Sequence, residues 1–421
     1  MFTIKAYHNP YLQVGQSRVQ AVLTVNVNQS VSLTPAPLAL AIALDHSGSM
    51  DGAKMRAARD GAIKVIQALD ENITFMVVSF NERAKVIVPP CGGTPKHKKQ
   101  AVEAMQHIYA TGGTCMSYAL DTIVQHFGQD ASRALKILFL TDGRNEGEQR
   151  RDLDRAIENC RRVQASISAW GIGTDWDEAE LRHMAEATHG SADIIPTPQQ
   201  VEAAFTAAFM EMRNTSITSA RLRLWSPAGV KIHRFEQVYP NIVPLGLEPD
   251  SANPRYQVAS LGSFAAGDGR DYLLDLDVPT YDPGQQFLMV RPSISYFAAG
   301  SSSELEEKSA QDGWVFVQWT EDASLAAQME EHIAHYTHQE DLLRSLKEGQ
   351  AYLAVGDYDK ATRMLGQALE ISERTGNDRI TRLLSQLVMR DAKGTIQLNK
   401  QASEVARKTL AINSGRTSKL K

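Results

Sequence analysis

Five oxygen-bearing side chains occur where they could bind a metal ion together. They are Asp45, Ser47, Ser49, Thr114 and Asp142. The first three follow the apolar run 38–44, the fourth ends a Thr-Gly-Gly-Thr sequence, and the last follows the apolar run 135–140. In a parallel sheet, the carboxyl ends of the strands border one crevice. Hydroxyl and carboxylate oxygens are the ligands that a hard divalent cation such as Mg²⁺ prefers, so the sequence predicts a metal site there.

Each of these motifs also has a simpler structural explanation. Asp45 and Ser47 could cap a helix that begins near Asp51, and Asp142 could lie in a turn. For any one motif alone, this explanation is the better one. The three motifs together, in this order along the chain, favour the metal site.

The three motifs resemble those of a known family. Asp-x-Ser-x-Ser at 45–49, Gly-Gly-Thr at 112–114 and Thr-Asp-Gly at 141–143 are similar to the metal-ion-dependent adhesion site of the von Willebrand factor A (VWA) domain. The resemblance covers about residues 38–212, and all five metal-site positions match.

This resemblance implies roles for the five side chains. Ser47, Ser49 and Thr114 would bind Mg²⁺ or Mn²⁺ directly. Asp45 and Asp142 would bind it directly or through water, and one coordination position would stay open for an acidic side chain of a partner protein. We therefore expect a metal-dependent adaptor protein. The partners that the resemblance suggests are MoxR-type AAA ATPases and kinase, phosphatase or forkhead-associated signalling proteins.

Two enzyme motifs are incomplete in the same loop, which favours a protein without catalytic activity. A phosphatase with Asp45 as nucleophile normally has a second carboxylate two residues later, where this chain has Ser47. A serine hydrolase normally has glycine two residues before its nucleophile, and neither Ser47 nor Ser49 does. Two alternatives to the adaptor stay open. One is a metal-dependent phosphoester hydrolase, and the other is a structural subunit of a larger assembly with a stabilising metal.

The elements that must position these side chains alternate between strands and helices across residues 38–212. Strands are expected at 38–44, 73–80, 86–88, 135–140, 167–170 and 194–195, and helices near 53–69, 96–108, 118–127, 151–163, 177–187 and 199–212. This alternation predicts an α/β fold with a doubly wound, mostly parallel, Rossmann-like sheet.

Strand-rich segments flank this block on both sides. Residues 1–37 contain the alternating run 19–27, and residues 213–319 contain further strand patterns, including a hairpin expected about the turn at 226–229. Because the N-terminal strands could not bury their apolar faces alone, we predict a β-sandwich into which the α/β domain is inserted.

The segment 320–410 is predicted to be an α-helical domain. The pattern at 349–368 resembles one tetratricopeptide (TPR) unit. A single unit cannot bury its own apolar face. We therefore expect one TPR-like helical hairpin packed within a small helical domain.

The overall composition excludes several classes of protein. The 421 residues carry 44 Lys and Arg against 49 Asp and Glu, a net charge of -5, which argues against a nucleic-acid-binding protein. Three cysteines are too few for a disulfide framework. The sequence shows no signal-peptide pattern and no apolar run of roughly 18 residues, so no membrane span is expected. We therefore expect a cytoplasmic location.

Residues 411–421 are predicted to form a basic, flexible tail. The segment 394–421 carries six basic and one acidic side chains, whereas 301–348 carries 11 acidic and three basic ones, so the tail could instead bind that acidic segment. Thr409 and Thr417 each have an aliphatic residue three positions later. If phosphorylated, such segments resemble what forkhead-associated domains recognise.

Overall fold

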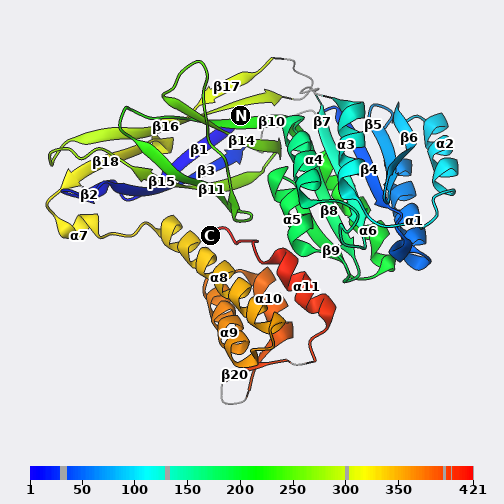
Figure 1. The fold of residues 1–421 in the computed structure, drawn as a ribbon. Coiled ribbons are helices and arrows are strands. Elements are labelled where there is room, and N and C mark those ends of the chain that lie inside the picture. The colour runs from blue at the N-terminus through cyan, green and yellow to red at the C-terminus, as the bar shows by residue number, and fades with distance from the viewer. Residues whose placement is uncertain (29–35, 129–132, 299–302, 392–394, 400, 421) are drawn as a thin grey trace.

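Three parts make up the molecule, as Figure 1 shows: a β-sandwich, an α/β domain beside it, and a helical region below both. The computed structural model describes residues 1–28, 36–128, 133–298, 303–391, 395–399 and 401–420. The described C-terminal segment ends close to the place where the three parts meet. Among the described helices, none is both long enough and apolar enough to cross a membrane.

The α/β domain is built on a six-stranded sheet in the order β6-β5-β4-β7-β8-β9. Its strands are β4 (Leu38–Asp45), β5 (Thr74–Phe80), β6 (Ala84–Gly92), β7 (Ala134–Thr141), β8 (Ser166–Ile172) and β9 (Ser191–Ile195). All neighbouring pairs are parallel except β5 and β6. The prediction of a doubly wound, mostly parallel sheet is confirmed.

Helices cover both faces of this sheet. They are α1 (Ala53–Ala68), α2 (Pro95–Met105), α3 (Met116–Phe127), α4 (Arg150–Arg162), α5 (Glu178–Ala187) and α6 (Val201–Arg213). Along β4, Leu40 and Ile42 share a core with α1, α2 and α6, whereas Ala41 and Ala43 share a core with α3, α4 and α5. A strand with both faces covered has no solvent side, which explains the unbroken apolar run at 38–44.

The β-sandwich consists of two sheets, one in the order β1-β3-β15-β11-β12 and the other in the order β13-β14-β10-β16-β18-β2, with β17 paired to β16. The strands are β1 (Phe2–Tyr7), β2 (Tyr11–Gln13), β3 (Arg18–Val27), β10 (Thr215–Trp225), β11 (Lys231–Tyr239), β12 (Val243–Pro244), β13 (Glu248–Pro249), β14 (Tyr256–Ala265), β15 (Gly269–Asp277), β16 (Gln286–Ala298), β17 (Leu305–Lys308) and β18 (Val315–Thr320). Apolar side chains from both sheets share one core. Strands on both sides of residues 38–212 thus build one sandwich, into which the α/β domain is inserted.

The predicted hairpin about residues 226–229 is wrong. Strand β10 pairs with β14 and β16 in one sheet, whereas β11 pairs with β15 and β12 in the other. The turn therefore crosses from one layer of the sandwich to the other. Consecutive strands pair only about two-thirds of the time, and here both strands bury side chains in the shared core from opposite sides.

The helical region contains α8 (Glu331–Ala354), α9 (Tyr358–Arg374), α10 (Asp378–Leu387) and α11 (Glu404–Asn413), with a short α7 (Ala323–Ala326) before them and the strand pair β19 (Val388–Arg390) and β20 (Ile396–Leu398). Helices α8 and α9 pack closely, since a Cβ at Gly349 would lie 2.7 Å from the Leu365 side chain. A shared core joins these helices to α10 and α11. The α8–α9 pair is the helical hairpin within this region.

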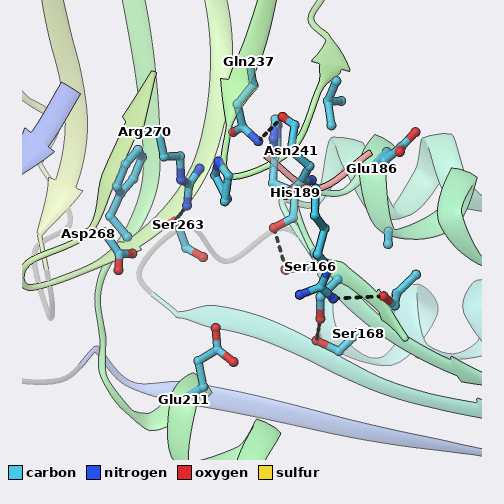
Figure 2. Close-up of a pocket in the computed structure, with 18 of the residues that line it drawn as sticks. Ser166, Ser168, Glu186, His189, Glu211, Gln237, Asn241, Ser263, Asp268 and Arg270 are labelled. Carbon is cyan, nitrogen blue, oxygen red and sulfur yellow. Dashed lines mark hydrogen bonds between the residues drawn. The ribbon is translucent and has the colours of Figure 1, made fainter. Parts of the chain in front are cut away.

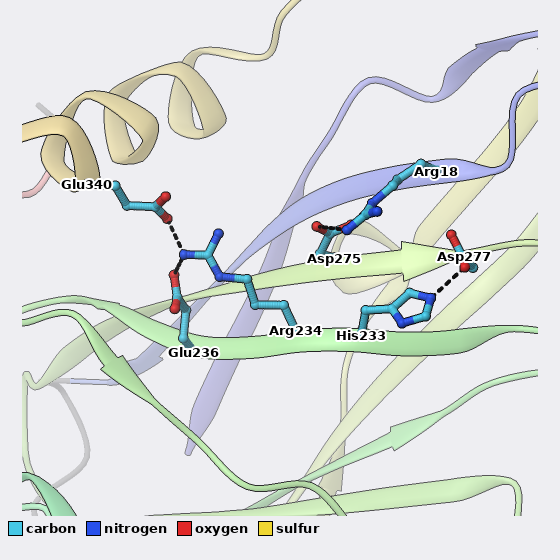
Figure 3. Close-up of polar contacts among 7 residues, drawn as sticks. All are labelled: Arg18, His233, Arg234, Glu236, Asp275, Asp277 and Glu340. Atoms are coloured by element: carbon cyan, nitrogen blue, oxygen red, sulfur yellow. Dashed lines mark hydrogen bonds and ion pairs between the residues drawn. The ribbon is translucent and has the colours of Figure 1, made fainter. Parts of the chain in front are cut away.

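Helix α8 rests on the outer face of the five-stranded sheet. Ile333 and Tyr336 pack with Val22, Val238 and Leu273 of that sheet. The contact also has a polar part, shown in Figure 3, in which Arg234 of β11 donates to Glu236 and, at 2.7 Å, to Glu340 of α8. The helical region is thus held to the sandwich by both apolar packing and an ion pair.

The segment that follows α11 makes specific contacts, which differs from the predicted flexible tail. Thr417 donates its backbone N–H to Pro240 at 2.8 Å and its hydroxyl to Val238 at 2.6 Å. The Ser418 hydroxyl accepts from Gln339 of α8 at 2.8 Å and donates to Thr375 at 2.9 Å. These contacts with α8 use neutral groups, so charge attraction to the acidic segment does not explain them. Residue 421 lies outside the described residues.

Candidate metal site

The five predicted site residues lie at the carboxyl end of the parallel sheet. Asp45 is the last residue of β4, and Asp142 directly follows the neighbouring strand β7. A third segment, residues 111–114, is held over the loop that follows β4: Thr111 donates its N–H to His46 at 2.7 Å, and Gly48 donates to Gly112 at 2.9 Å. The order of the strands therefore brings together residues nearly one hundred positions apart.

Asp45 is fully buried and hydrogen-bonded on both carboxylate oxygens. Its Oδ1 accepts the backbone N–H of Ser47 at 2.8 Å, and its Oδ2 accepts the hydroxyl of Thr141 at 2.5 Å. Burial nevertheless raises its pKa to about 6, because desolvation of the charged form outweighs these hydrogen bonds. A nearby cation would offset that cost.

The hydroxyls and the second carboxylate form a connected group. Ser47 and Ser49 bring their hydroxyl oxygens to 3.1 Å, and Ser49 donates to Asp142 Oδ1 at 2.6 Å. Thr114 lies beside them, since a Cβ added at Gly143 would be 3.3 Å from Thr114 Oγ1 and 3.5 Å from Ser49 Oγ. Glycine at 143 leaves room for this approach. All five side chains thus lie in one small region.

The helix-capping explanation does not describe this geometry. The residue that precedes α1 is Gly52, with a φ of 78°, and its cap uses no side chain. Ser47 precedes a short 3₁₀ turn, Gly48–Met50, and makes no capping hydrogen bond through its side chain. Asp45 accepts from the loop itself. The polar side chains are therefore arranged toward one another and not toward the helix.

A cation that the sequence did not reveal, Lys54, contacts the site. Its ammonium lies 2.5 Å from Asp142 Oδ2, and its side chain is 27% exposed. Lys54 is in the first turn of α1, where no local pattern distinguishes it from other surface lysines. Its position shows that the site attracts positive charge.

The donor set fits a hard divalent cation. Two carboxylates and three hydroxyls supply oxygen ligands only, as Mg²⁺ or Mn²⁺ requires. Within the described ranges, no group of three or more His, Cys, Asp or Glu side chains is placed to hold a metal ion. The five-residue group, which has only two carboxylates, is therefore the candidate that the described chain offers.

Two exposed tyrosines lie close to Thr114 along the chain. Tyr109 precedes the segment 111–114 and is 69% exposed, and Tyr118 lies in the first turn of α3 and is 50% exposed. Exposed large aromatic side chains are enriched where proteins bind one another.

Comparison with known proteins identifies the α/β domain. Residues 39–206 match the von Willebrand factor type A domain family, so the chain contains a VWA domain. A solved structure described as von Willebrand factor type A from Catenulispora acidiphila matches 100% of this chain and 97% of its own chain, with 28% identity and a TM-score of 0.89. The similarity to that structure therefore extends over all three parts.

Two further matches are more distant. The ArnB paralog VWA2 from Sulfolobus acidocaldarius matches 99% of this chain and 98% of its own chain, with a TM-score of 0.63 but 14% identity, so it shows the fold alone. An uncharacterized protein from Synechocystis, sll0103, is 28% identical over 259 residues, which are 60% of this chain and 60% of that protein. The chain therefore aligns with less than two-thirds of that curated relative.

Proposed function

We propose that the VWA domain binds Mg²⁺ or Mn²⁺ through Asp45, Ser47, Ser49, Thr114 and Asp142, and docks an acidic side chain of a partner protein on the metal. The chain would then work as a metal-dependent adaptor and not as an enzyme. The observation that carries this proposal is the convergence of five oxygen side chains from three segments at the carboxyl end of the sheet.

The charges at the site support a cation with one open position. Two carboxylates would balance a divalent ion, while the hydroxyls would supply neutral oxygen ligands. Mg²⁺ demands near-octahedral coordination, so five protein groups leave room for a further oxygen. A Glu or Asp of a partner would supply it, and Tyr109 and Tyr118 would provide apolar contact area around it.

Lys54 would then act as a competitor for the metal. Its ammonium already contacts Asp142 Oδ2, so a divalent cation must share or displace that contact. The metal-free protein would keep Asp142 partly neutralised, which limits the electrostatic cost of an unoccupied acidic site.

A binding experiment tests the adaptor function. Partner capture by the full chain would be compared in Mg²⁺, in EDTA and with Asp142→Ala, using the exposed Asp60→Ala on α1 as the control. We expect capture to be lost with EDTA and with Asp142→Ala and retained with the control. If neither treatment weakens capture, docking through the metal is wrong.

Two measurements separate the alternatives. Hydrolysis of a generic phosphoester that disappears in Asp45→Asn would favour the hydrolase. A melting temperature that rises with Mg²⁺ while no capture depends on the metal would favour a structural role.

Family resemblance supplies the candidate partners and location. A MoxR-type AAA ATPase, or a kinase, phosphatase or forkhead-associated protein, is the partner to test first, and a cytoplasmic location is part of this proposal. The side chains of Thr409 and Thr417 donate to backbone carbonyls of Val405 and Val238. Phosphorylation of either threonine would have to break such a bond, so recognition through the metal site is the simpler mode.

A further inference from the structure

A cavity of about 540 Å³ lies where the three parts of the molecule meet, away from the metal site. We call it the junction cavity. The VWA domain contributes Lys136 and Ser166, the sandwich contributes Ser263 and Arg270, and the segment after α11 contributes Arg416. Figure 2 labels polar side chains of the VWA domain and the sandwich around the cavity. Its volume is within the range of small-molecule sites.

Lys136 is a cation buried beneath the sandwich. It lies on β7, is only 8% exposed, and its ammonium donates to the Ser263 hydroxyl at 2.5 Å. Burial, together with the nearby charge of Arg270, lowers its pKa to about 8, although the carboxylates of Glu211 and Asp268 oppose this shift. Within the described chain Lys136 forms no ion pair, although burying an unpaired charge is costly. An anion in the cavity would remove that cost.

Ser263, which accepts from Lys136, also accepts from Arg270 and so holds the two cations near each other. One guanidinium nitrogen donates to the carbonyl oxygen of Ser263 at 2.5 Å, another donates to Leu261, and the guanidinium lies 3.8 Å over the Phe264 ring. A guanidinium has five N–H donors, so the two carbonyl bonds fix its orientation without using all of them. Two cations thus face the same part of the cavity, and Arg270 also forms no ion pair among the described residues.

A third cation has an unused donor. Arg182 of α5 lines the cavity and donates to Ala411, but its Nε is buried without a hydrogen-bond partner. His189, which also lines the cavity, has its pKa lowered to about 3 by burial and by the charges of Arg270, Arg161 and Lys136. Near neutral pH, its ring is therefore an uncharged hydrogen-bonding group beside the cations.

The remaining polar groups in the cavity favour a ligand that carries other polar groups besides its anionic group. Glu186, Glu211 and Asp268 also line it, together with Asn241 and Ser166. In Figure 2, Glu186 and Glu211 lie apart from Arg270. Asp268, by contrast, lies beside Ser263 and Arg270 in Figure 2. Carboxylates among the cations suit a small molecule that carries an anionic group and a hydroxyl or amino group.

We propose that the junction cavity binds a small organic anion, with its carboxylate or phosphate between Lys136 and Arg270. Such a ligand would contact all three parts at once and would hold them together. Because the cavity shares no residue with the metal site, this inference does not depend on the proposed function of the VWA domain.

A thermal-unfolding experiment on the full chain, without added divalent metal, tests the proposal. Succinate, inorganic phosphate and phosphoserine would be compared at equal ionic strength with sodium chloride, which separates carboxylate from phosphate recognition. We expect at least one of these anions to raise the melting temperature by roughly 2–4 °C. The Asp142→Ala variant should respond equally, since the metal site is not involved.

Substitution of the cation should remove the response. Lys136→Met keeps the length of the side chain and removes its charge, and we expect it to weaken anion binding roughly tenfold or more. The exposed Lys99→Met on α2 is the matched control and should bind as the wild type does. If none of the three anions shifts the melting temperature, or if Lys136→Met responds like the control, the proposal is wrong.

Hydrogen exchange on the wild-type protein gives an independent answer if Lys136→Met does not fold. Bound anion should slow exchange of backbone amides at 189–191 and 415–416, which line the cavity, and leave the loop 45–49 unchanged. Slower exchange confined to 45–49 would place the anion at the metal site and would overturn the proposal.

Discussion

The two ends of the VWA sheet carry opposite chemistry. The carboxyl end holds Asp45, Asp142 and three hydroxyls, with one lysine in contact. The amino end holds Lys136 on β7, with Arg270 of the sandwich beside it. Lys136 and Asp142 are six residues apart, so β7 separates the two sites by roughly 20 Å. One end is suited to a cation and the other to an anion.

The difference reflects how each end is covered. Both connections to the sandwich lie at the amino end, where Ala36 donates to Thr215 at 2.8 Å. The sandwich and the segment after α11 close over that end and make a cavity, whereas the carboxyl end points away from the sandwich in Figure 1. An open end suits a protein partner, and an enclosed end suits a small molecule.

The largest expected effect concerns metal binding at the carboxyl end of the sheet. Asp142→Ala removes a carboxylate from the proposed metal site, so we expect affinity for Mg²⁺ or Mn²⁺ to fall by roughly 100-fold or more, measured by calorimetric titration. Asp60→Ala should bind metal normally. Normal metal affinity in Asp142→Ala would show that these side chains are not the ligands.

The second prediction concerns the attachment of the helical region near the amino end. Tyr336→Phe removes the hydroxyl that donates to the buried carboxylate of Asp271. Because Asp271 Oδ1 already lacks a partner, we expect a loss of roughly 2–3 kcal/mol of stability, measured by urea unfolding. Metal affinity should not change. Tyr352→Phe on the same helix is the control, and an equal loss there would contradict this reasoning.

The stability of the contact between α8 and the sandwich should also depend on pH. Burial raises the pKa of Glu236 from 4.5 to about 7, although Arg234 opposes this shift. The folded protein therefore binds more protons than the unfolded chain between these values, so this group's contribution to stability falls as pH rises from 4.5 to about 7 and is constant above. We expect a loss of roughly 1–2 kcal/mol across this range. Glu236→Gln should flatten that part of the unfolding profile, and an unchanged slope would show that another group titrates.

The smallest expected effect concerns the competition between Lys54 and a metal ion at the carboxyl end of the sheet. Lys54→Met removes the ammonium that competes for Asp142, so we expect metal affinity to rise about three- to fivefold. Calorimetric titration measures this change, with Lys64→Met on the exposed side of α1 as the control. A fall in affinity would mean that Lys54 supports the site instead of competing for it.

The candidate metal site at the carboxyl end could be predicted because most of its residues occur in short sequence motifs. Asp45, Ser47 and Ser49 lie within five positions, and the rule that parallel strand ends meet brought Asp142 to them. Thr114 follows a helix, so only the family resemblance linked it to the others. Lys54 could not be found in this way, since a single lysine on a helix carries no signal. The hairpin was wrongly predicted for a related reason: a turn sequence does not say which sheet the next strand joins.

Short sequence motifs do not reveal the cation pair at the amino end of the sheet. Lys136 sits within an apolar strand, and its neighbour Ser263 is 127 positions away in another part of the fold. Only the packing of the sandwich against the VWA domain brings these residues together. A site between two domains that are far apart in the sequence has no local pattern from which it could be predicted.

The contacts of Thr417 also imply that the junction cavity is completed late in protein synthesis. Its hydroxyl bonds to Val238, which is 179 positions earlier, and Arg416 lines the junction cavity. Since domains generally fold as units during synthesis, the VWA domain with its proposed metal site would fold before these residues leave the ribosome. The cavity is closed only when they arrive. An anion that needs the complete cavity would therefore bind finished chains only, whereas the proposed metal site would already be present in stalled ones.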